Sequence, residues 1–392
     1  MTDGHLTGRT IFCIGMTQLI NWGITFYMPG AFGAAVMAET GWSQVATFSG
    51  MTVALLVMGV VSPLTGRVML CAGGRTMMMA GTLAVAVGCF LMAFTHTLPG
   101  WIAVWALTGV GMRFALYDAA FALLVDIAGA QARRAISLVT LLGGLASAAF
   151  WPAGAALLHI TDWRHAVIVY GCAGLVSLFF LSAVPAGRRV SLPVSSQASP
   201  AIGTSEERRV LISGLWYATL IALMSFVSTG VSTHFPQILA AYGMPALTGM
   251  LWGVGQVGAR LLDVASGARI SALRLNLITG ILLPLCFLVG LAGKVSPAAT
   301  AFFVLGYGAV NGLSTVVKAI LPLVLFDPLR YARKTGVLLS PGFFFAALAP
   351  SAYALLLEHY GISGTLLISL TLTLFITAIS VVLWYRHCGC MK

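Results

Sequence analysis

The stretch PAGRRVSLPVSSQASPAIGTSEERR, residues 185–209, is the longest polar segment of the 392-residue chain and lies near its centre. Its serines, prolines and charges of both signs are typical of a linker. On either side the chain is apolar: 59% of all residues are hydrophobic and 8% are charged, against about 25% charged in a soluble domain. A soluble fold needs more polar side chains to cover its surface. The sequence therefore predicts a polytopic membrane protein and excludes a soluble enzyme, a disordered chain and a secreted disulfide scaffold.

Twelve apolar segments flank this stretch, six on each side. Each is long enough to cross a hydrocarbon core, which takes about 20 helical residues, and none shows the short alternating pattern of a transmembrane barrel. We expect an all-α membrane protein with an N-terminal six-helix bundle at 1–184, a cytoplasmic linker at 185–208 and a C-terminal six-helix bundle at 209–392. The predicted spans are 10–37, 43–70, 75–95, 100–126, 133–158, 163–184, 209–240, 245–266, 272–293, 298–326, 333–357 and 362–385.

Basic residues indicate the orientation. Sixteen lysines and arginines fall in the termini and in the gaps on the linker side, and only Arg164 and Lys294 fall in gaps on the other side. Because positive charge accumulates in cytoplasmic loops, we expect both termini in the cytoplasm. A nucleic-acid-binding protein would instead gather its basic residues on one solvated face. The excess of arginine over lysine, 17 to 4, and the abundant alanine hint at a GC-rich bacterium, for which the inner membrane is the default location.

The two halves look like copies of each other. Arg133-Arg134 opens the fifth segment as Arg333-Lys334 opens the eleventh, and Pro152 and Pro350 follow at corresponding depths. Parallel repeats of six helices occur in secondary transporters, with the substrate site at the repeat interface.

Several local motifs are similar to those of the major facilitator superfamily, which the chain resembles over essentially its whole length. The family pattern G-x-x-x-D-R-x-G-R-R corresponds to GRVMLCAGGR at 66–75, with Leu70 at the acidic position. The pattern R-x-x-x-G-x-G corresponds to WALTGVG at 105–111, and the antiporter pattern of the fifth span to WPAG at 151–154. Asn21-Trp22-Gly23, and Arg133-Arg134-Ala135 leading to Asp162-Trp163-Arg164, resemble the bacterial monocarboxylate and oxalate–formate branch.

The resemblance implies that spans 1, 4, 7 and 10 line a central cavity, and their polar residues agree with it. At helical spacing these residues form one stripe on each span, and a polar stripe in a membrane faces water or another helix. Serine and threonine can also bond back to their own helix. The candidate substrate-binding residues are Asn21, Thr25, Arg113, Tyr117, His234, Asn311 and Lys318.

The buried charges suggest the chemistry. Arg113 lies at the middle of its span, where a charge costs about 2.5–3.5 kcal/mol or more. A pair with Asp118 looks unfavourable, since five residues place the two side chains about 140° apart on a helix. We expect Arg113 and Lys318 to be cavity cations, although Lys318 could instead snorkel to the cytoplasm. Asp118 is the candidate proton carrier or the partner of Lys318. His234 could titrate near neutrality or serve only as a hydrogen-bonding residue.

Arginines near the cytoplasmic ends suggest an inner gate. Arg67 and Arg75 lie in the gap between the second and third spans. Arg260 and Asp263 are three residues apart on one helical face, and the repeat places them near the cytoplasmic end. We expect these two to pair with each other at the gate.

The sequence thus predicts a secondary transporter that moves a small, monocarboxylate-like anion by alternating access, with a proton as the coupling ion. The alternatives are an efflux pump for drugs or metalloids and, outside the carriers, a channel or membrane sensor. No catalytic cluster, cofactor motif or metal site is found, so we expect no enzyme and no cofactor. The expected partners are the substrate, the lipid bilayer and the proton, with no nucleic acid, and the protein is expected to be a monomer. Cys388 and Cys390 in the tail have no assigned role.

Overall fold

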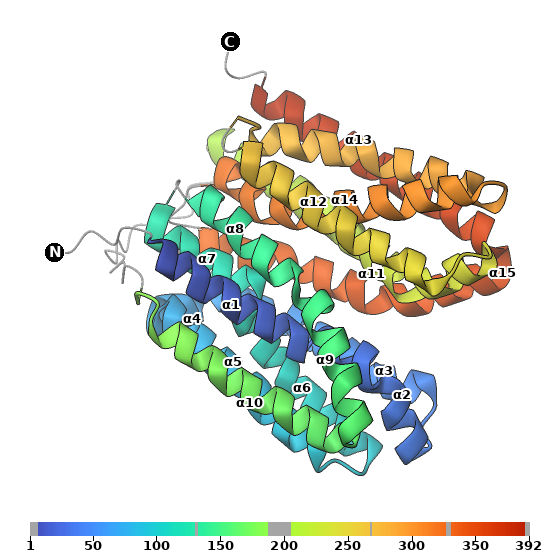
Figure 1. Cartoon of the computed structure of the whole chain (residues 1–392). Helices are drawn as coiled ribbons and strands as arrows, with labels where there is room; N and C mark the ends of the chain where they lie inside the picture. Colours follow the sequence, from blue (N-terminus) through green and yellow to red (C-terminus); the bar gives the residue numbers. More distant parts are fainter. Residues whose placement is uncertain (1–6, 130–131, 187–204, 267–268, 327–330, 389–392) are drawn as a thin grey trace.

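A computed structural model describes residues 7–129, 132–186, 205–266, 269–326 and 331–388. Every regular element in this part of the chain is helical, as the sequence predicts. Most of the predicted linker, 185–208, and Cys390 lie outside the described residues. Figure 1 shows the helices gathered into two bundles, one from each half of the chain.

Several of the predicted spans in the N-terminal bundle are broken into two helices (Figure 1). Its elements are α1 (Gly8–Ile24), α2 (Met28–Thr40), α3 (Gln44–Val61), the 3-10 turn η1 (Ser62–Leu64), α4 (Thr65–Ala72), α5 (Gly74–Ala93), α6 (Leu98–Ala115), α7 (Tyr117–Ala128), α8 (Ala132–Gly144), α9 (Ala146–Ile160) and α10 (Trp163–Ser182).

The C-terminal bundle has longer uninterrupted helices. Its elements are α11 (Ser205–Ala241), the 3-10 turn η3 (Ala246–Gly249), α12 (Met250–Ser266), α13 (Ala272–Leu291), the 3-10 turn η4 (Ala292–Lys294), α14 (Pro297–Leu325) and α15 (Tyr331–Cys388). The backbone of α15 leaves the helical conformation at Gly361 (φ 63°, ψ −172°), so α15 contains two of the predicted spans.

Nine stretches of the described chain are long and apolar enough to cross a membrane by length and composition. The stretch in α15 counts once but holds two spans. The fourth and eighth spans are not among the nine, because Arg113 lowers the hydropathy of α6 and because α12 has only 17 residues. With these included, the helices are consistent with the twelve predicted spans.

Two of the breaks have local causes in the sequence. The chain leaves the helix between α1 and α2 because Pro29, in the first turn of α2, lacks an amide hydrogen and its ring excludes the carbonyl four residues earlier. The break at Leu145 follows Gly143 and Gly144, and glycine is a poor helix former.

The break at Leu116, in the fourth span, has no such signal. Leu116 has an extended backbone (φ −82°, ψ −173°) between α6 and α7. In a continuous helix the carbonyl of Ala115 would accept a hydrogen bond from the amide of Ala119, but that amide bonds to Leu116 O instead. The Nε2 group of Gln18 donates to Ala115 O at 2.8 Å and so satisfies the freed carbonyl.

Polar side chains fix the ends of helices away from the linker. Asp162 caps α10 by accepting a hydrogen bond from the His165 backbone amide at 2.9 Å. This bond, which favours the charged carboxylate, lowers the pKa of Asp162 from its ordinary value. Next to it, Arg164 Nε lies 2.8 Å from Glu39 Oε1, and Trp163 Nε1 donates to Glu39 Oε2. These contacts tie the end of α2 to the start of α10.

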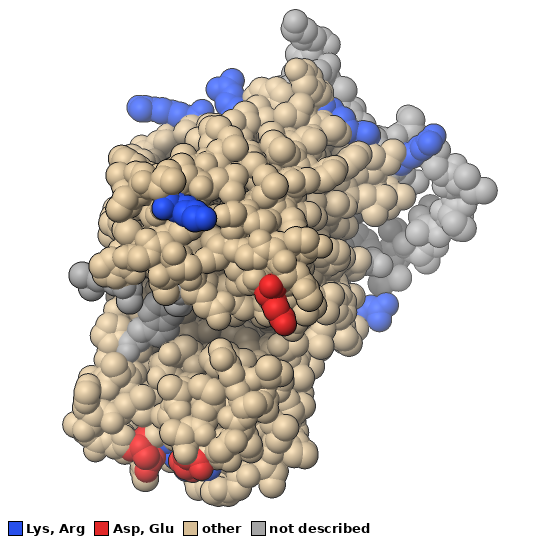
Figure 2. Space-filling view, turned by 90° about the vertical axis from the view of Figure 1, so that its right-hand side faces the viewer, with Lys and Arg blue, Asp and Glu red and all other residues tan. Residues whose placement is uncertain are grey.

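The two bundles meet mainly at the end where α10 stops and α11 begins, which we call the linker end. There α15 packs on α3, η1 and α4, and α8 packs on α12 and α14. Ser62 Oγ donates to Gly336 O at 2.5 Å, and Ser340 Oγ donates to Gly59 O at 2.6 Å. Figure 2 views the opposite end and shows a hollow between the bundles. The structure is therefore closed at the linker end and open at the other.

Candidate functional site

An ionic cluster joins the two bundles where the fourth and tenth spans meet. Asp118, at the start of α7, lies 3.7 Å from Arg113 Nη1 and 3.2 Å from Lys318 Nζ of α14. Phe343 of α15 covers both cations: its ring centre is 5.4 Å from the guanidinium carbon of Arg113 and 5.2 Å from Lys318 Nζ. Arg113 Nε also donates to Ser62 Oγ at 3.0 Å. A single carboxylate thus serves two cations from different halves of the chain.

The pairing of Arg113 with Asp118 corrects the expectation that helix geometry disfavours it. That expectation assumed a continuous helix, in which five residues turn the two side chains about 140° apart. The extended backbone at Leu116 separates α6 from α7, so the two residues belong to different helices and face each other. Arg113 is 2% exposed, and Asp118 compensates its charge.

Lys318 does not reach away from the protein as a snorkelling side chain would. Its side chain is 26% exposed, and its ammonium group points to Asp118 of the other bundle. It lies one helical turn beyond Thr315 on α14, and Thr315 in turn contacts Arg260. The cations Lys318 and Arg260 therefore approach neighbouring positions on the same face of α14.

Arg260 lies deeper than the sequence suggests, and it is not paired with Asp263. Its guanidinium donates to Thr315 Oγ1 at 3.0 Å and to Gly312 O at 3.4 Å. A Cβ atom added at Gly144 would collide with Arg260 Nη1, which places the guanidinium at the break in the middle of the fifth span. Alignment of the two halves of the chain gives the depth of the Arg260 backbone only. The long side chain of Arg260 extends from α12 across to the other bundle.

The charge of Arg260 is uncompensated within the described part of the chain. Arg260 is 3% exposed, and the ion pairs found among the described residues do not include it. Its Nη1 atom is buried and has no hydrogen-bond partner there. The groups that it does contact, Thr315 and Gly312, are neutral. A buried cation in a membrane is costly unless something negative compensates it.

Two tyrosines bring hydroxyl groups to the same place. Tyr27, at the break between α1 and α2, and Tyr117, at the start of α7, lie within electrostatic reach of Arg260. Tyr117 donates to Thr140 O at 3.2 Å, and a Cβ atom at Gly143 would collide with its hydroxyl oxygen. The adjacent glycines 143 and 144 thus leave room for Tyr117 and Arg260.

Asp263 belongs to a separate contact at the linker end. Its Oδ2 accepts a hydrogen bond from Ser137 Oγ of α8 at 2.6 Å, and its Oδ1 lies 3.9 Å from Arg133 Nη2. Asp263 thereby connects the C-terminal bundle to the start of the fifth span. The two other predicted gate residues, Arg67 and Arg75, do not take part in this contact. Arg67 is exposed, and Arg75 Nη1 donates a hydrogen bond to Val184 O at 3.1 Å within the N-terminal bundle.

Asn21 and Thr25 do not face the space between the bundles. Both are fully buried. Asn21 Nδ2 donates to Thr82 Oγ1 of α5 at 2.9 Å, and Thr25 Oγ1 donates back to Asn21 O at 2.5 Å. The correction has a simple physical reason: the stripe on α1 packs inside its own bundle, where Asn21 Nδ2 and the Thr25 hydroxyl find hydrogen-bond partners. Asn21 Oδ1 is buried there without a partner among the described residues.

His234 and Asn311 are held within the C-terminal bundle. His234 Nε2 lies 2.8 Å from Pro350 O and its Nδ1 lies 3.0 Å from Gln237 Oε1. Asn311 Oδ1 accepts a hydrogen bond from Ser228 at 2.6 Å. Both side chains are partly exposed.

Sequence reasoning missed several residues that build the site. Ser62, Ser137 and Phe343 carry no charge or motif that would mark them. Only the packing of the two halves brings Ser62 and Phe343 to the ionic cluster and Ser137 to Asp263. Gly144 carried a weak signal, since a pair of glycines inside an apolar span indicates close approach of another group.

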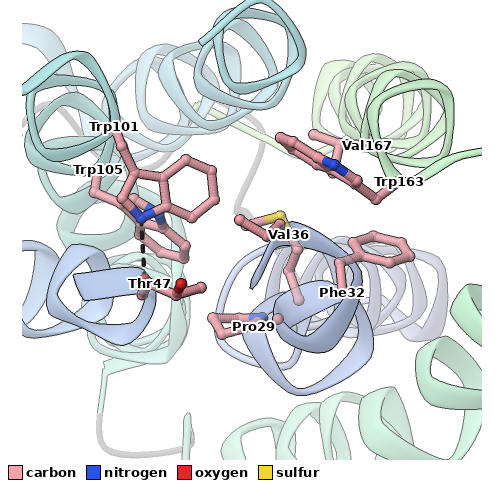
Figure 3. A pocket seen from close by; sticks show the side chains of 10 residues that line it. Pro29, Phe32, Val36, Thr47, Trp101, Trp105, Trp163 and Val167 are labelled. Carbon is pink, nitrogen blue, oxygen red and sulfur yellow. Dashed lines mark hydrogen bonds between the residues drawn. The ribbon is translucent and has the colours of Figure 1, made fainter. Parts of the chain in front are cut away.

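A second feature is an apolar pocket inside the N-terminal bundle, away from the ionic cluster (Figure 3). Trp101, Trp105 and Trp163 form much of its wall, and Trp101 Nε1 donates to Thr47 O at 3.0 Å. Trp105 takes the place of the family's arginine, and its ring lies so close to α3 that a Cβ atom at Gly50 would collide with it. Trp105 therefore packs where a charge would otherwise lie.

The chain is similar to known proteins in sequence and in fold. The family model described as Major Facilitator Superfamily matches residues 11–324, and no relative matches among curated proteins. The structure of the human organic anion transporter MFSD10 (TETRAN) aligns with a TM-score of 0.72 at 16% identity, covering 95% of this chain and 99% of that one. The proton:xylose symporter XylE, bound to 6-bromo-6-deoxy-D-glucose, aligns with a TM-score of 0.75 at 13% identity, covering 96% and 95%. At these identities the two structures are similar in fold.

Proposed function

The chain belongs to the Major Facilitator Superfamily, and on that premise we propose that it carries a small organic anion by alternating access, with a proton as the coupling ion. The family makes it a membrane transporter rather than an enzyme. The proposed anion is monocarboxylate-like, and the proposed location is a bacterial inner membrane with both termini in the cytoplasm, in accord with the basic residues on the linker side.

The main support for an anionic substrate is the buried charge of Arg260, which no acidic residue compensates in the described part of the chain. This cation is buried between the two bundles, contacts only neutral groups and leaves Nη1 without a partner among the described residues. An organic carboxylate would compensate the charge and would match the planar guanidinium with two parallel hydrogen bonds. Arg113 and Lys318, which the sequence favoured, share the carboxylate of Asp118, whereas Arg260 has no carboxylate partner among the described residues. That MFSD10 is an organic anion transporter accords with this choice.

The position of Asp118 supports proton coupling. As a carboxylate it links Arg113 of one bundle to Lys318 of the other and helps to hold the linker end closed. Protonation would remove its charge and weaken the link between the bundles. Binding of a proton would therefore favour opening at the linker end, and its release would favour closing. The XylE symporter, which has the same fold, is also driven by protons.

Counterflow in proteoliposomes tests the proposal. Vesicles containing the purified protein are loaded with acetate, lactate, benzoate, xylose or the cationic dye ethidium, and entry of the same labelled compound is followed. We expect saturable counterflow for at least one of the acids and none for xylose or ethidium. Counterflow of ethidium alone would favour the efflux alternative, and non-saturable flux would favour a channel. Either outcome would overturn the proposal.

A further inference from the structure

Opposite Arg260 the N-terminal bundle presents a group of aromatic rings centred on Trp22. The ring centre of Trp22 lies 4.9 Å from Tyr117, 5.2 Å from Phe26 and 6.4 Å from Tyr27. These residues come from α1, from the break that follows it and from the start of α7, so the two helix breaks bring them together. We call Trp22, Phe26, Tyr27 and Tyr117 the aromatic cluster.

Three members of the aromatic cluster are more exposed than the tryptophans of the core, while the fourth, Tyr117, is buried. Trp22, Phe26 and Tyr27 are each half-buried, whereas Trp105 is 1% exposed. The Nε1 atom of Trp22 is nevertheless buried and has no hydrogen-bond partner in the described part of the chain. A buried indole N–H normally finds an acceptor, so this donor can serve a group that is absent from the structure.

The aromatic cluster and the uncompensated cation adjoin each other. Tyr27 and Tyr117 are the cluster members within electrostatic reach of Arg260. The side chains of Tyr117 and Arg260 also contact α8 at adjacent residues: Tyr117 lies against Gly143 and Arg260 lies against Gly144. A ligand that places a carboxylate on Arg260 would therefore have its remaining atoms beside aromatic rings.

Resting on the proposed function, we propose that the transported anion is an aromatic monocarboxylate, with its carboxylate on Arg260 and its ring against the aromatic cluster. One negative charge matches the site because Arg260 is a buried cation with no carboxylate partner among the described residues, while Arg113 and Lys318 share the carboxylate of Asp118. An aromatic ring on the ligand fits because two rings with centroids about 4.5–7 Å apart stabilise each other by more than the burial of their apolar area alone. A short aliphatic acid would leave the cluster unused.

Binding of a matched series of compounds to the purified parent protein tests this. The probes are benzoate, cyclohexanecarboxylate, acetate, the dianion phthalate and neutral benzamide. We expect benzoate to bind most tightly, cyclohexanecarboxylate about threefold to tenfold more weakly for loss of ring stacking, and acetate more weakly still. Phthalate should bind poorly because its second carboxylate would lie beside the neutral rings of the aromatic cluster, and benzamide should not bind.

Two substitutions locate the ring. Trp22→Leu should weaken benzoate about threefold to tenfold and leave acetate unchanged, while Phe12→Leu, an exposed position of the same helix, should change neither. If Trp22→Leu does not fold, Phe26→Leu takes its place. Equal binding of benzoate, cyclohexanecarboxylate and acetate, or benzoate binding unaffected by the cluster variants, would overturn the aromatic assignment and leave the anion proposal intact. Binding of benzamide as tight as that of benzoate would overturn the anion proposal itself.

Discussion

Asp118 and Lys318 are 200 residues apart in the chain, yet the Oδ1 atom of Asp118 lies 3.2 Å from Lys318 Nζ and joins the two bundles. Arg113 approaches the same carboxylate from its own bundle at 3.7 Å. Two cations on one acid leave the cluster with a net positive charge, and loss of the acid's charge would leave the cations to repel each other. This ionic contact between the halves, one of several at the linker end, therefore depends on the charge of one carboxylate.

We expect Asp118→Asn to separate exchange from accumulation. The amide keeps the shape of the side chain but cannot bind and release a proton. Accumulation of the substrate driven by a pH gradient should therefore be lost, while counterflow is largely retained. Both activities are measured in the same proteoliposomes. Unchanged gradient-driven uptake would remove Asp118 from the coupling mechanism, and equal loss of both activities together with poor folding would assign it a purely structural role.

Arg113→Gln should destabilise the protein. Arg113 is buried and paired, and breaking a buried ion pair on one side costs about 3–5 kcal/mol; the remaining contact of Asp118 with Lys318 places the expected value at the lower end. The double variant Arg113→Gln with Asp118→Asn should be no more stable than the single one, because it also removes the carboxylate partner of Lys318. Thermal unfolding in detergent measures both. A single variant as stable as the parent would show that the charge of Arg113 is not held by Asp118.

A methyl group at position 144 should weaken anion binding without a change of charge. In Gly144→Ala the new Cβ would occupy the position of Arg260 Nη1, so the guanidinium must move away from its place between the bundles. We expect about tenfold weaker binding of an organic acid, equal to about 1.4 kcal/mol. Gly258→Ala on α12, where a Cβ has open space, is the matched control. Equal binding by the two variants would place the anion elsewhere.

Cysteine labelling tests the orientation in the membrane. In a background without the native thiols, Ser196→Cys in the sequence linker should react with an impermeant maleimide only after cell lysis. Val295→Cys, an 83% exposed position in the gap between α13 and α14, should react in intact cells. The opposite pattern would invert the topology that the basic residues predict.

Much of the fold was predictable because it depends on composition. Apolar length sets the spans, and the polar stretch divides them six and six. The break at Leu116 was not predictable, since Gln18 and the packing around Ala115 stabilise it rather than any glycine or proline. The pair between Arg113 and Asp118 was missed for that reason.

The candidate site was predicted only in part. Arg113, Asp118 and Lys318 could be found because charges are rare in apolar spans and each one requires a compensating group. The environment of Arg260 could not be found, because the long side chain reaches the other bundle and the two glycines that receive it lie in another span. Asn21 and Thr25 fit the polar pattern of a cavity stripe, but Asn21 bonds to Thr82 of α5 and Thr25 bonds back to its own helix.

The central claim is that Arg260 binds the transported anion. It is tested most directly by the dissociation constants of acetate, lactate and benzoate for the parent, for Arg260→Gln and for Arg67→Gln, an exposed arginine at the linker end. A hydrogen bond to charge contributes about 1.5–3 kcal/mol, so Arg260→Gln should weaken the tightest of the three acids about tenfold to a hundredfold, while Arg67→Gln binds as the parent does. Parent-like affinity in a folded Arg260→Gln protein would contradict the claim.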